Sequence, residues 1–284
     1  MNGGFMKEKL KLIIKGAFIG IANIIPGVSG GTLAITMGIY EDLIGAISHF
    51  FKDLKKNINL LLFIGIGAVL AILLVSKLIN YTLDAFPFAT ILFFIGLILG
   101  GMPMLFKKIK GETKKPVNWI ILALTFGLVV GFTFLNGQSA DVILTDMNLL
   151  GYIKLFFVGM IAAATMVIPG ISGSFILMLI GYYEPLIKII SGLTDFSNLG
   201  SNLTILIPFG IGVVLGIVLI AKLIEYLLKH FEIKTYFGII GFVIASIITI
   251  VMQVVGVSIA VPEILVGIIL AVAGFAVAYK LDEQ

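Results

Sequence analysis

Ile25-Pro26-Gly27-Val28-Ser29-Gly30 recurs 143 residues later as Ile168-Pro169-Gly170-Ile171-Ser172-Gly173, and each copy lies between apolar segments. Proline cannot continue a helix, and glycine adopts backbone angles that other residues avoid, so each copy predicts a break between two helices. Aligned without gaps, residues 11–48 and 154–191 are identical at 15 of 38 positions. The phrase therefore marks an internal duplication centred on two helix breaks.

The similarity continues at an offset of 145, where residues 65–96 align with residues 210–241. Shared apolar composition alone does not produce matched glycine, lysine and tyrosine residues. The matched pairs include Gly65/Gly210, Gly67/Gly212, Lys77/Lys222, Tyr81/Tyr226 and Gly96/Gly241. We therefore predict two copies of one unit, residues 1–140 and 141–284, within one integral membrane domain.

The composition is that of an integral membrane protein. Hydrophobic residues make up 60% of the 284 residues and charged residues 12%, and the mean hydropathy is +1.19. The net charge of +4 comes from lysine alone, so it serves as a topology signal rather than a nucleic-acid signature. The chain has no cysteine, which excludes disulfides and thiolate metal ligands.

Apolar runs of two lengths are present. A membrane-spanning helix needs about 20 apolar residues, and we predict six full spans at 58–80, 86–106, 117–136, 203–228, 234–254 and 261–280. Shorter uncharged runs flank the two breaks, at 16–25, 155–168 and 173–183 and in the run that ends at Glu41. Such lengths favour re-entrant hairpins, at about 10–48 and about 151–191, over the alternative of two cramped full spans for each hairpin.

The lysine distribution predicts the topology. Lysines cluster at the N-terminus, at 52–56 and at 107–115, with Lys280 near the C-terminus. The positive-inside rule therefore places both termini in the cytoplasm. Since the N-terminus and the 52–56 loop are both basic, the first motif must return the chain to the side it came from. The predicted fold is an all-α polytopic membrane protein with an inverted internal repeat, six full transmembrane helices and two opposed re-entrant helical hairpins.

The residues after each break resemble an anion site. A helix that starts there has amide groups without a partner inside the helix, and they carry the positive end of its dipole. Two such termini that converge from opposite sides would suit a phosphate or a carboxylate. The predicted binding residues are Gly27, Ser29, Gly30, Gly31, Thr32, Gly170, Ser172, Gly173 and Ser174. The alternative is a packing device in which Ser29 and Ser172 only cap their helices.

Further polar residues lie near the breaks. Asn23 and Thr165 precede them and could bind the ligand or satisfy the freed backbone. The duplicated acids, each next to a duplicated tyrosine, could form a proton site or a gate, or could mark where a half-helix leaves the bilayer. These are Tyr40 with Glu41 and Tyr183 with Glu184. Lys77 and Lys222 are expected to snorkel, or to gather an anionic lipid head at each leaflet.

The paired phrases, followed by Gly38-Ile39-Tyr40-Glu41 and Gly181-Tyr182-Tyr183-Glu184, resemble the bacterial and archaeal polyprenyl-phosphate transporter family called PopT, formerly a domain of unknown function. The resemblance covers essentially the whole chain. It implies a translocase in the plasma membrane of a prokaryote that returns undecaprenyl phosphate from the outer to the inner leaflet for cell-envelope polymer synthesis. Members of the family often carry an acid just before the first Ile-Pro-Gly, whereas this chain has Asn23.

Two other functions remain open. Undecaprenyl-pyrophosphate phosphatase also uses inverted re-entrant hairpins, but phosphoryl transfer relies on cationic or metal clamps and a positioned base, and the predicted tips contain no His, Arg, Asp or Glu. A carrier or channel for a small soluble ion is the stronger rival. We therefore expect no enzyme activity, no metal and no cofactor. The expected partners are the polyprenyl-phosphate lipid and membrane lipids, without nucleic acid, and homo-oligomers are left open.

Overall fold

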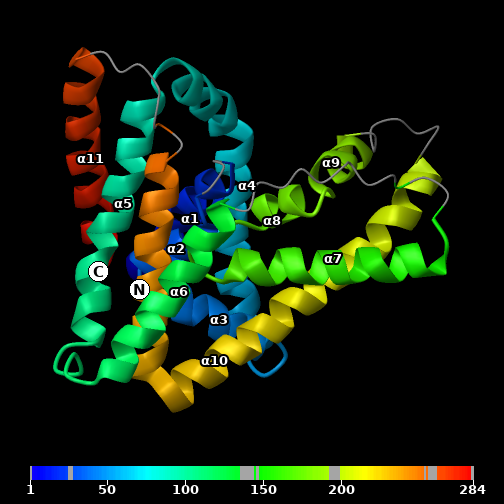
Figure 1. Cartoon of the computed structure of the whole chain (residues 1–284), viewed down its shortest axis with the longest axis horizontal. Helices are drawn as coiled ribbons and strands as arrows, with labels where there is room; N and C mark the ends of the chain where they lie inside the picture. The colour runs from blue at the N-terminus through cyan, green and yellow to red at the C-terminus, as the bar shows by residue number, and fades with distance from the viewer. Residues whose placement is uncertain are drawn as a thin grey trace.

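The chain is helical throughout the described part of the computed structural model, which covers residues 2–24, 28–134, 144, 147–191, 199–252, 254 and 261–282 (Figure 1). Those residues contain no strand. In chain order the helices are α1 (Asn2–Ile24), α2 (Gly30–Thr36), α3 (Tyr40–Ser48), α4 (Leu54–Ala85), α5 (Pro87–Lys108), α6 (Pro116–Phe134), α7 (Leu149–Val167), α8 (Gly173–Leu179), α9 (Tyr183–Ser191), α10 (Leu199–Met252) and α11 (Val261–Asp282).

Within the described residues, five helices are long and apolar enough to cross a membrane, namely α4, α5, α7, α10 and α11, and α6 is a shorter apolar helix. A straight helix of 54 residues, the length of α10, would extend about 80 Å, against a hydrocarbon core of about 30 Å. The backbone of α10 leaves the helical region at Phe231 (φ −136°, ψ 40°). The helix therefore consists of two segments, α10a (199–230) and α10b (232–252), in agreement with the predicted spans 203–228 and 234–254.

The two copies of the duplicated sequence have the same local backbone. Ser29 (φ −97°, ψ 127°) precedes α2, and Ser172 (φ −98°, ψ 128°) precedes α8. The two helices have equal lengths of 7 residues. The pair Phe86 and Phe231 also matches at the offset of 145, and Phe86 breaks the path from α4 to α5 with φ −140° and ψ 58°. The duplication thus sets the helix breaks as well as the helices.

At the second Pro-Gly motif the chain turns back, so that α8 packs against α7 (Figure 1). The predicted short arm 155–168 is wrong in length, because α7 has 19 residues and reaches spanning length. Lys154 lies inside this helix near its start and does not end it. In the first copy α2 packs against α1, which has 23 residues. Arm length therefore no longer favours re-entrant hairpins over spans.

The two copies exchange their last helices. In each copy the first helix packs along the fourth, α1 on α4 and α7 on α10a. The last helix of each copy packs instead on the other copy, because α6 lies along α10b and α11 lies along α5 (Figure 1). This exchange ties residues 1–140 to residues 141–284.

Glycines permit the close approach of α1 to α4 and of α7 to α10a. A methyl group at Gly67 would overlap the backbone of Ile13, and one at the matched Gly212 would overlap the backbone of Phe156. Small residues are the usual means by which membrane helices approach closely, since lipid offers no hydrophobic driving force between them. Gly67 and Gly212 are thus packing residues.

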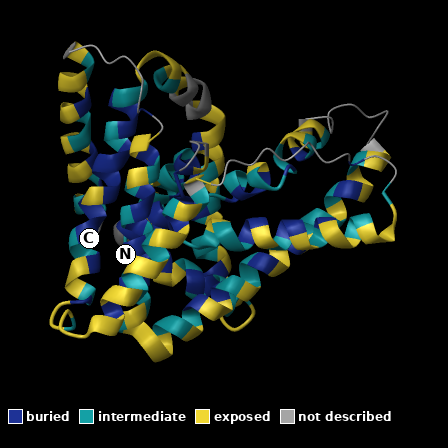
Figure 2. Ribbon diagram, viewed as in Figure 1, coloured by how far each residue is buried: buried dark blue, intermediate teal, exposed yellow. Residues whose placement is uncertain are grey.

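The environments of the two copies are unequal. All residues of α2 are buried, whereas the buried residues of α8 are Gly173, Ile176 and Leu177. Figure 2 shows the buried residues concentrated in the body that contains α2 and α5, while α7, α8, α9 and α10a project to one side. The helix after the first break, α2, therefore lies in the core and the matching helix α8 at its edge.

The connections that carry lysine lie at one end of the molecule. The connection from α3 to α4, the connection from α5 to α6 and the break at Phe231 are all at the bottom of Figure 1. They carry Lys52–Lys56, the lysines of 107–115, and Lys229 with Lys234. We call this the lysine-rich end.

We predict that Gly67→Ala and Gly212→Ala destabilise the fold, by about 1–3 kcal/mol each, because the added methyl group meets backbone that cannot move aside. The measurement is thermal unfolding of the purified protein in detergent.

Gly65→Ala and Gly210→Ala are the matched controls, since no atom lies within 4 Å of a methyl group at either position. They should leave the unfolding temperature unchanged or raise it slightly, because alanine is the better helix former. Equal losses in both pairs would contradict the packing role.

Candidate functional site

The start of α2 and the second Pro-Gly break meet inside the protein. The Gly170 amide donates a hydrogen bond of 2.7 Å to Thr32 Oγ1, and the Tyr40 hydroxyl donates one of 3.1 Å to the Val167 carbonyl. Gly31 completes the contact, because a methyl group there would lie 2.9 Å from the Val167 oxygen. The start of α2 therefore rests directly on the second break.

Ser29 lies beside this contact and carries an unsatisfied hydroxyl. Its side chain is 2% exposed, and its Oγ has no hydrogen-bond partner among the described residues. It occupies the N-cap position of α2, yet the hydroxyl accepts no bond from the first turn. A buried hydroxyl without a partner costs about 1–3 kcal/mol, so this group is suited to a ligand or a water molecule.

The second tip is more open. Ser172 and Ser174 are partly exposed, and their hydroxyl oxygens are 2.7 Å apart. Ser172 makes no side-chain cap to α8. Both serines therefore occupy the N-cap position, as the packing alternative expects, but neither hydroxyl bonds to the first turn of its helix. Gly170 has φ +80°, which favours glycine, and Gly173 is buried against α7 beside Met166.

The two polar residues before the breaks are placed differently. Asn23 is exposed at the end of α1, and its amide adjoins Gly30, where a methyl group would lie 2.7 Å from its Oδ1. Thr165 donates its hydroxyl to the Ala162 carbonyl at 2.8 Å, so that group serves its own helix. The predicted Gly27 lies outside the described residues.

A charged cluster forms around Glu41 at the lysine-rich end. The Lys108 ammonium lies 3.0 Å from the Glu41 carboxylate and 3.9 Å from that of Glu232. The buried Tyr236 hydroxyl donates to the same Glu41 oxygen, and Lys108 lies over the Tyr236 ring at 5.1 Å. Partial burial raises the pKa of Glu41, but the hydrogen bonds from Tyr236 and Lys108 outweigh it and hold that pKa below its ordinary value. The carboxylate therefore stays charged at neutral pH.

A cavity of about 240 Å³ adjoins this cluster. Its polar lining comes from Glu41, Asp42 and Tyr236, and its apolar lining from residues of α2 and α5 such as Ile35 and Leu105. The cluster ties α3 to α5 and α10b across the two copies of the repeat. Its place suits a closing contact at the lysine-rich end better than a binding centre.

The matched residues of the second copy have no such cluster. Glu184 is exposed, and no basic group of a described residue lies within ion-pair distance of it. Tyr183 packs only at the margin of a small apolar cluster. Lys222 is exposed on α10a, and Lys77 lies in α4 with its side chain outside the described part. The structure thus brings together the residues of the first tip and the second break.

Sequence reasoning missed Lys108 and Tyr236. In the sequence, Lys108 stands out only as a topology marker. Tyr236 aligns with Ile91 in the other copy, so the repeat does not single it out. Groups of three or more His, Cys, Asp or Glu residues that could hold a metal ion are absent from the described part of the chain.

The helices and their contacts define a polytopic membrane protein with a duplicated sequence, in which the start of α2 touches the second Pro-Gly break inside the protein. Comparison with known families agrees: the profile described as undecaprenyl phosphate translocase-like matches residues 19–264. The chain belongs to this family.

Two characterised relatives carry the name polyprenyl-phosphate transporter. The protein of Staphylococcus aureus is 32% identical over 240 residues, which is 83% of each chain. The protein of Vibrio cholerae is 30% identical over 252 residues, which is 84% of this chain and 76% of that protein. No solved structure matches the chain. The predicted family is therefore confirmed.

We predict that Glu41→Gln lowers the free energy of unfolding at pH 7 by at most about 1 kcal/mol, because the carboxylate is half exposed; thermal unfolding measures the loss. A lowered pKa in the folded state stabilises the fold above the ordinary value of 4.5 and ceases to do so as the pH falls through the lowered value. The unaltered protein should therefore lose stability below about pH 4.5 more steeply than Glu41→Gln.

Glu184→Gln is the matched control and should leave unfolding at pH 7 unchanged. A loss equal to that of Glu41→Gln would show that the cluster with Lys108 and Tyr236 adds nothing.

Proposed function

We propose that this protein moves a polyprenyl phosphate from the outer to the inner leaflet of the bacterial membrane, with the phosphate passing between the two Pro-Gly breaks. The names of both relatives support the substrate. The observation that carries the site is the buried, unpartnered Ser29 hydroxyl beside the contact of Thr32 with Gly170.

The lipid poses a specific physical problem. Its phosphate carries a charge that cannot enter hydrocarbon alone, whereas its tail can remain in lipid while the head crosses. The first amides of α2 and α8 and the hydroxyls of Ser29, Ser172 and Ser174 would replace the water around the phosphate. In this proposal a polar path exists only where the two breaks face each other.

The lysine-rich end faces the cytoplasm, with both chain termini on that side. The two hairpins enter from opposite faces, as in an inverted repeat, and the projecting part formed by α7, α8, α9 and α10a moves against the rest to expose the breaks to each leaflet in turn. The Thr32–Gly170 bond must open in each cycle to admit the phosphate.

The cluster of Glu41, Lys108 and Tyr236 acts as the gate at the lysine-rich end. A carboxylate with a lowered pKa does not take up a proton readily near neutral pH, which favours a gate over a proton carrier at Glu41. In a proton-coupled cycle, the group that binds the proton would be Glu184 or the lipid phosphate itself.

We predict that Ser29→Ala reduces transport by about tenfold or more, because a hydrogen bond to a charged group contributes roughly 1.5–3 kcal/mol. The fold should keep or gain stability, since the substitution removes a buried hydroxyl without a partner. Transport is measured in liposomes and stability by thermal unfolding.

Ser246→Ala is the matched control, because Ser246 is fully buried and its hydroxyl donates to the Val243 carbonyl at 2.8 Å. It should leave transport unchanged. Full transport by Ser29→Ala would indicate that the residues around the two breaks serve only for packing.

We predict that the purified protein in liposomes redistributes undecaprenyl phosphate between leaflets, and that the neutral alcohol does not compete, because the site selects the phosphate. Leaflet distribution is measured with the protein present, absent and carrying Ser29→Ala.

Equal redistribution in all three samples would exclude the flippase. Competition by free inorganic phosphate with no effect of the lipid would favour a carrier of a small soluble ion. Release of phosphate from a lipid pyrophosphate would indicate a phosphatase.

A further inference from the structure

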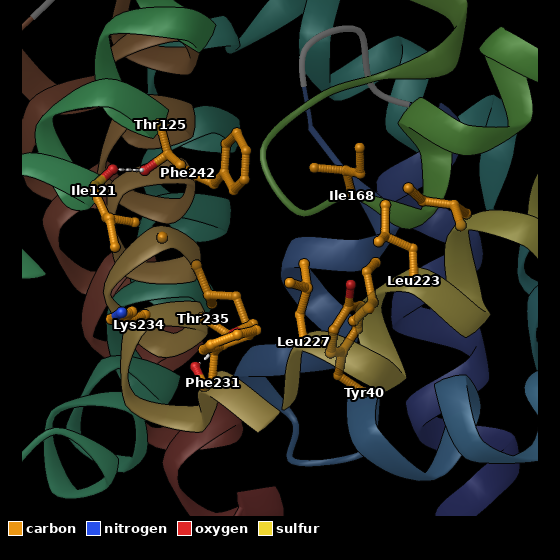
Figure 3. A pocket seen from close by; sticks show the side chains of 14 residues that line it. Tyr40, Ile121, Thr125, Ile168, Leu223, Leu227, Phe231, Lys234, Thr235 and Phe242 are labelled. Atoms are coloured by element: carbon orange, nitrogen blue, oxygen red, sulfur yellow. Dashed lines mark hydrogen bonds between the residues drawn. The ribbon is translucent and has the colours of Figure 1, made fainter. Parts of the chain in front are cut away.

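A large apolar cavity lies next to the second break, between two groups of helices that form its walls (Figure 3). One wall comes from α6 and α10b and includes Ile121 and Phe242. The other comes from α10a, with Leu223 and Leu227, and from Ile168 of the second break. The cavity measures about 470 Å³, within the range of about 300–1,000 Å³ of small-molecule pockets.

A second, polar cavity of about 310 Å³ adjoins it at the lysine-rich end. The two share Phe231, at the break of α10, and Lys234. The remaining lining of the second cavity is polar except for Ile233, with charges of both signs: Glu112, Lys115, Asn118, Lys229, His230 and Glu232. An apolar cavity therefore lies beside a charged one.

Lys234 lies at the boundary of the two cavities and has no acidic partner among the described residues. Lys229 pairs with Glu225 at 2.5 Å, and Lys115 pairs with Glu112 at 2.8 Å. Within the described ranges no carboxylate lies within ion-pair distance of the Lys234 ammonium, which sits 5.4 Å from the centre of the Phe231 ring. The boundary thus presents a lysine outside any ion pair of the described residues at the mouth of an apolar cavity, with Glu232 in the lining of the neighbouring one.

We propose that the two cavities together bind one lipid phosphate, with its head at Lys234 in the polar cavity and the first part of its hydrocarbon chain in the apolar cavity. An anionic head on an apolar chain matches this arrangement in both charge and polarity. The identity of the lipid as a polyprenyl phosphate rests on the function proposed above. The phosphate position at Lys234 is separate from the breaks, whereas the apolar cavity reaches Ile168 of the second break.

The apolar cavity leads from this site toward the breaks. Its floor includes the buried Tyr40, whose hydroxyl bonds the Val167 carbonyl, and Ile168 lies at its far end (Figure 3). Its rim includes Leu223, which is half exposed. A chain held there reaches the second break while its continuation stays in lipid. The site is therefore the docking position of the lipid at the lysine-rich end.

Gly238 allows a direct test of the apolar cavity. It lines the cavity, and a methyl group there would lie at 3.5 Å from Ile121 and Thr125, which is ordinary contact. Gly238→Leu should therefore fill the cavity without distorting α10b. Gly127→Leu in α6 is the matched control, because no atom lies within 4 Å of a methyl group at Gly127.

Lys234→Gln tests the charge, and Lys234→Arg should retain binding. Lys110→Gln is the control, since Lys110 is exposed at the lysine-rich end and lines neither cavity. Binding of undecaprenyl phosphate to the full-length protein in detergent is measured by native mass spectrometry. The neutral alcohol, phosphatidylglycerol and inorganic phosphate are the comparison ligands.

We expect Lys234→Gln to weaken binding of the lipid phosphate about tenfold, because a charged hydrogen bond is lost, and to leave binding of the alcohol unchanged. Gly238→Leu should weaken binding of both the phosphate and the alcohol. Gly127→Leu and Lys110→Gln should match the unaltered protein.

Unchanged binding in Gly238→Leu, or equal loss of phosphate and alcohol in Lys234→Gln, would overturn the proposal. Equal competition by phosphatidylglycerol would also overturn it, because the site would then be a general lipid contact. The proposed function fails separately: a protein that binds the lipid at Lys234 but redistributes none has the site without the transport. Normal transport by Gly238→Leu would contradict the proposed lipid site and leave the proposed function standing.

Discussion

A backbone amide inside a membrane must find an acceptor within the protein, because hydrocarbon offers none. The Gly170 amide follows Pro169 in a break between helices, so no helical carbonyl is in place for it. It donates instead to Thr32 Oγ1, on a different copy of the repeat. This bond forces the start of α2 against the second break, and the close approach in turn requires Gly31, which has no side chain to obstruct it. The burial of the first tip follows from this one contact.

The same bond accounts for the inequality of the two copies. Phe175 stands where Thr32 stands in the first copy, so the second copy has no hydroxyl at the matching position. Accordingly α2 is buried throughout and α8 is not. The buried Ser29 hydroxyl lacks a partner, whereas that of Ser172 lies 2.7 Å from Ser174 and partly exposed. A duplicated sequence thus gives one tight tip and one open tip.

Local features of the fold could be predicted from the sequence, and long-range partners could not. Pro26, Pro169 and the glycines beside them mark two helix breaks because their backbone restrictions act within a few residues. The length of α7 was underestimated because Lys154 near a helix end can extend to the interface without ending the helix. Lys108 and Tyr236 join Glu41 only through the packing of α3, α5 and α10b, which no spacing in the sequence records.

Two contacts must open in the proposed cycle, the Glu41–Lys108 pair and the Thr32–Gly170 bond, and they differ in strength. The Glu41–Lys108 pair is partly exposed at the lysine-rich end, where an ion pair contributes about 0–1 kcal/mol. The Thr32–Gly170 bond is buried, and separating its partners without replacement would leave an amide unpaired at a cost of about 1–3 kcal/mol. In the proposed cycle, separation of the tips is therefore favoured when another acceptor takes the amide. A phosphate oxygen is such an acceptor, so the ligand itself would stabilise the opened breaks.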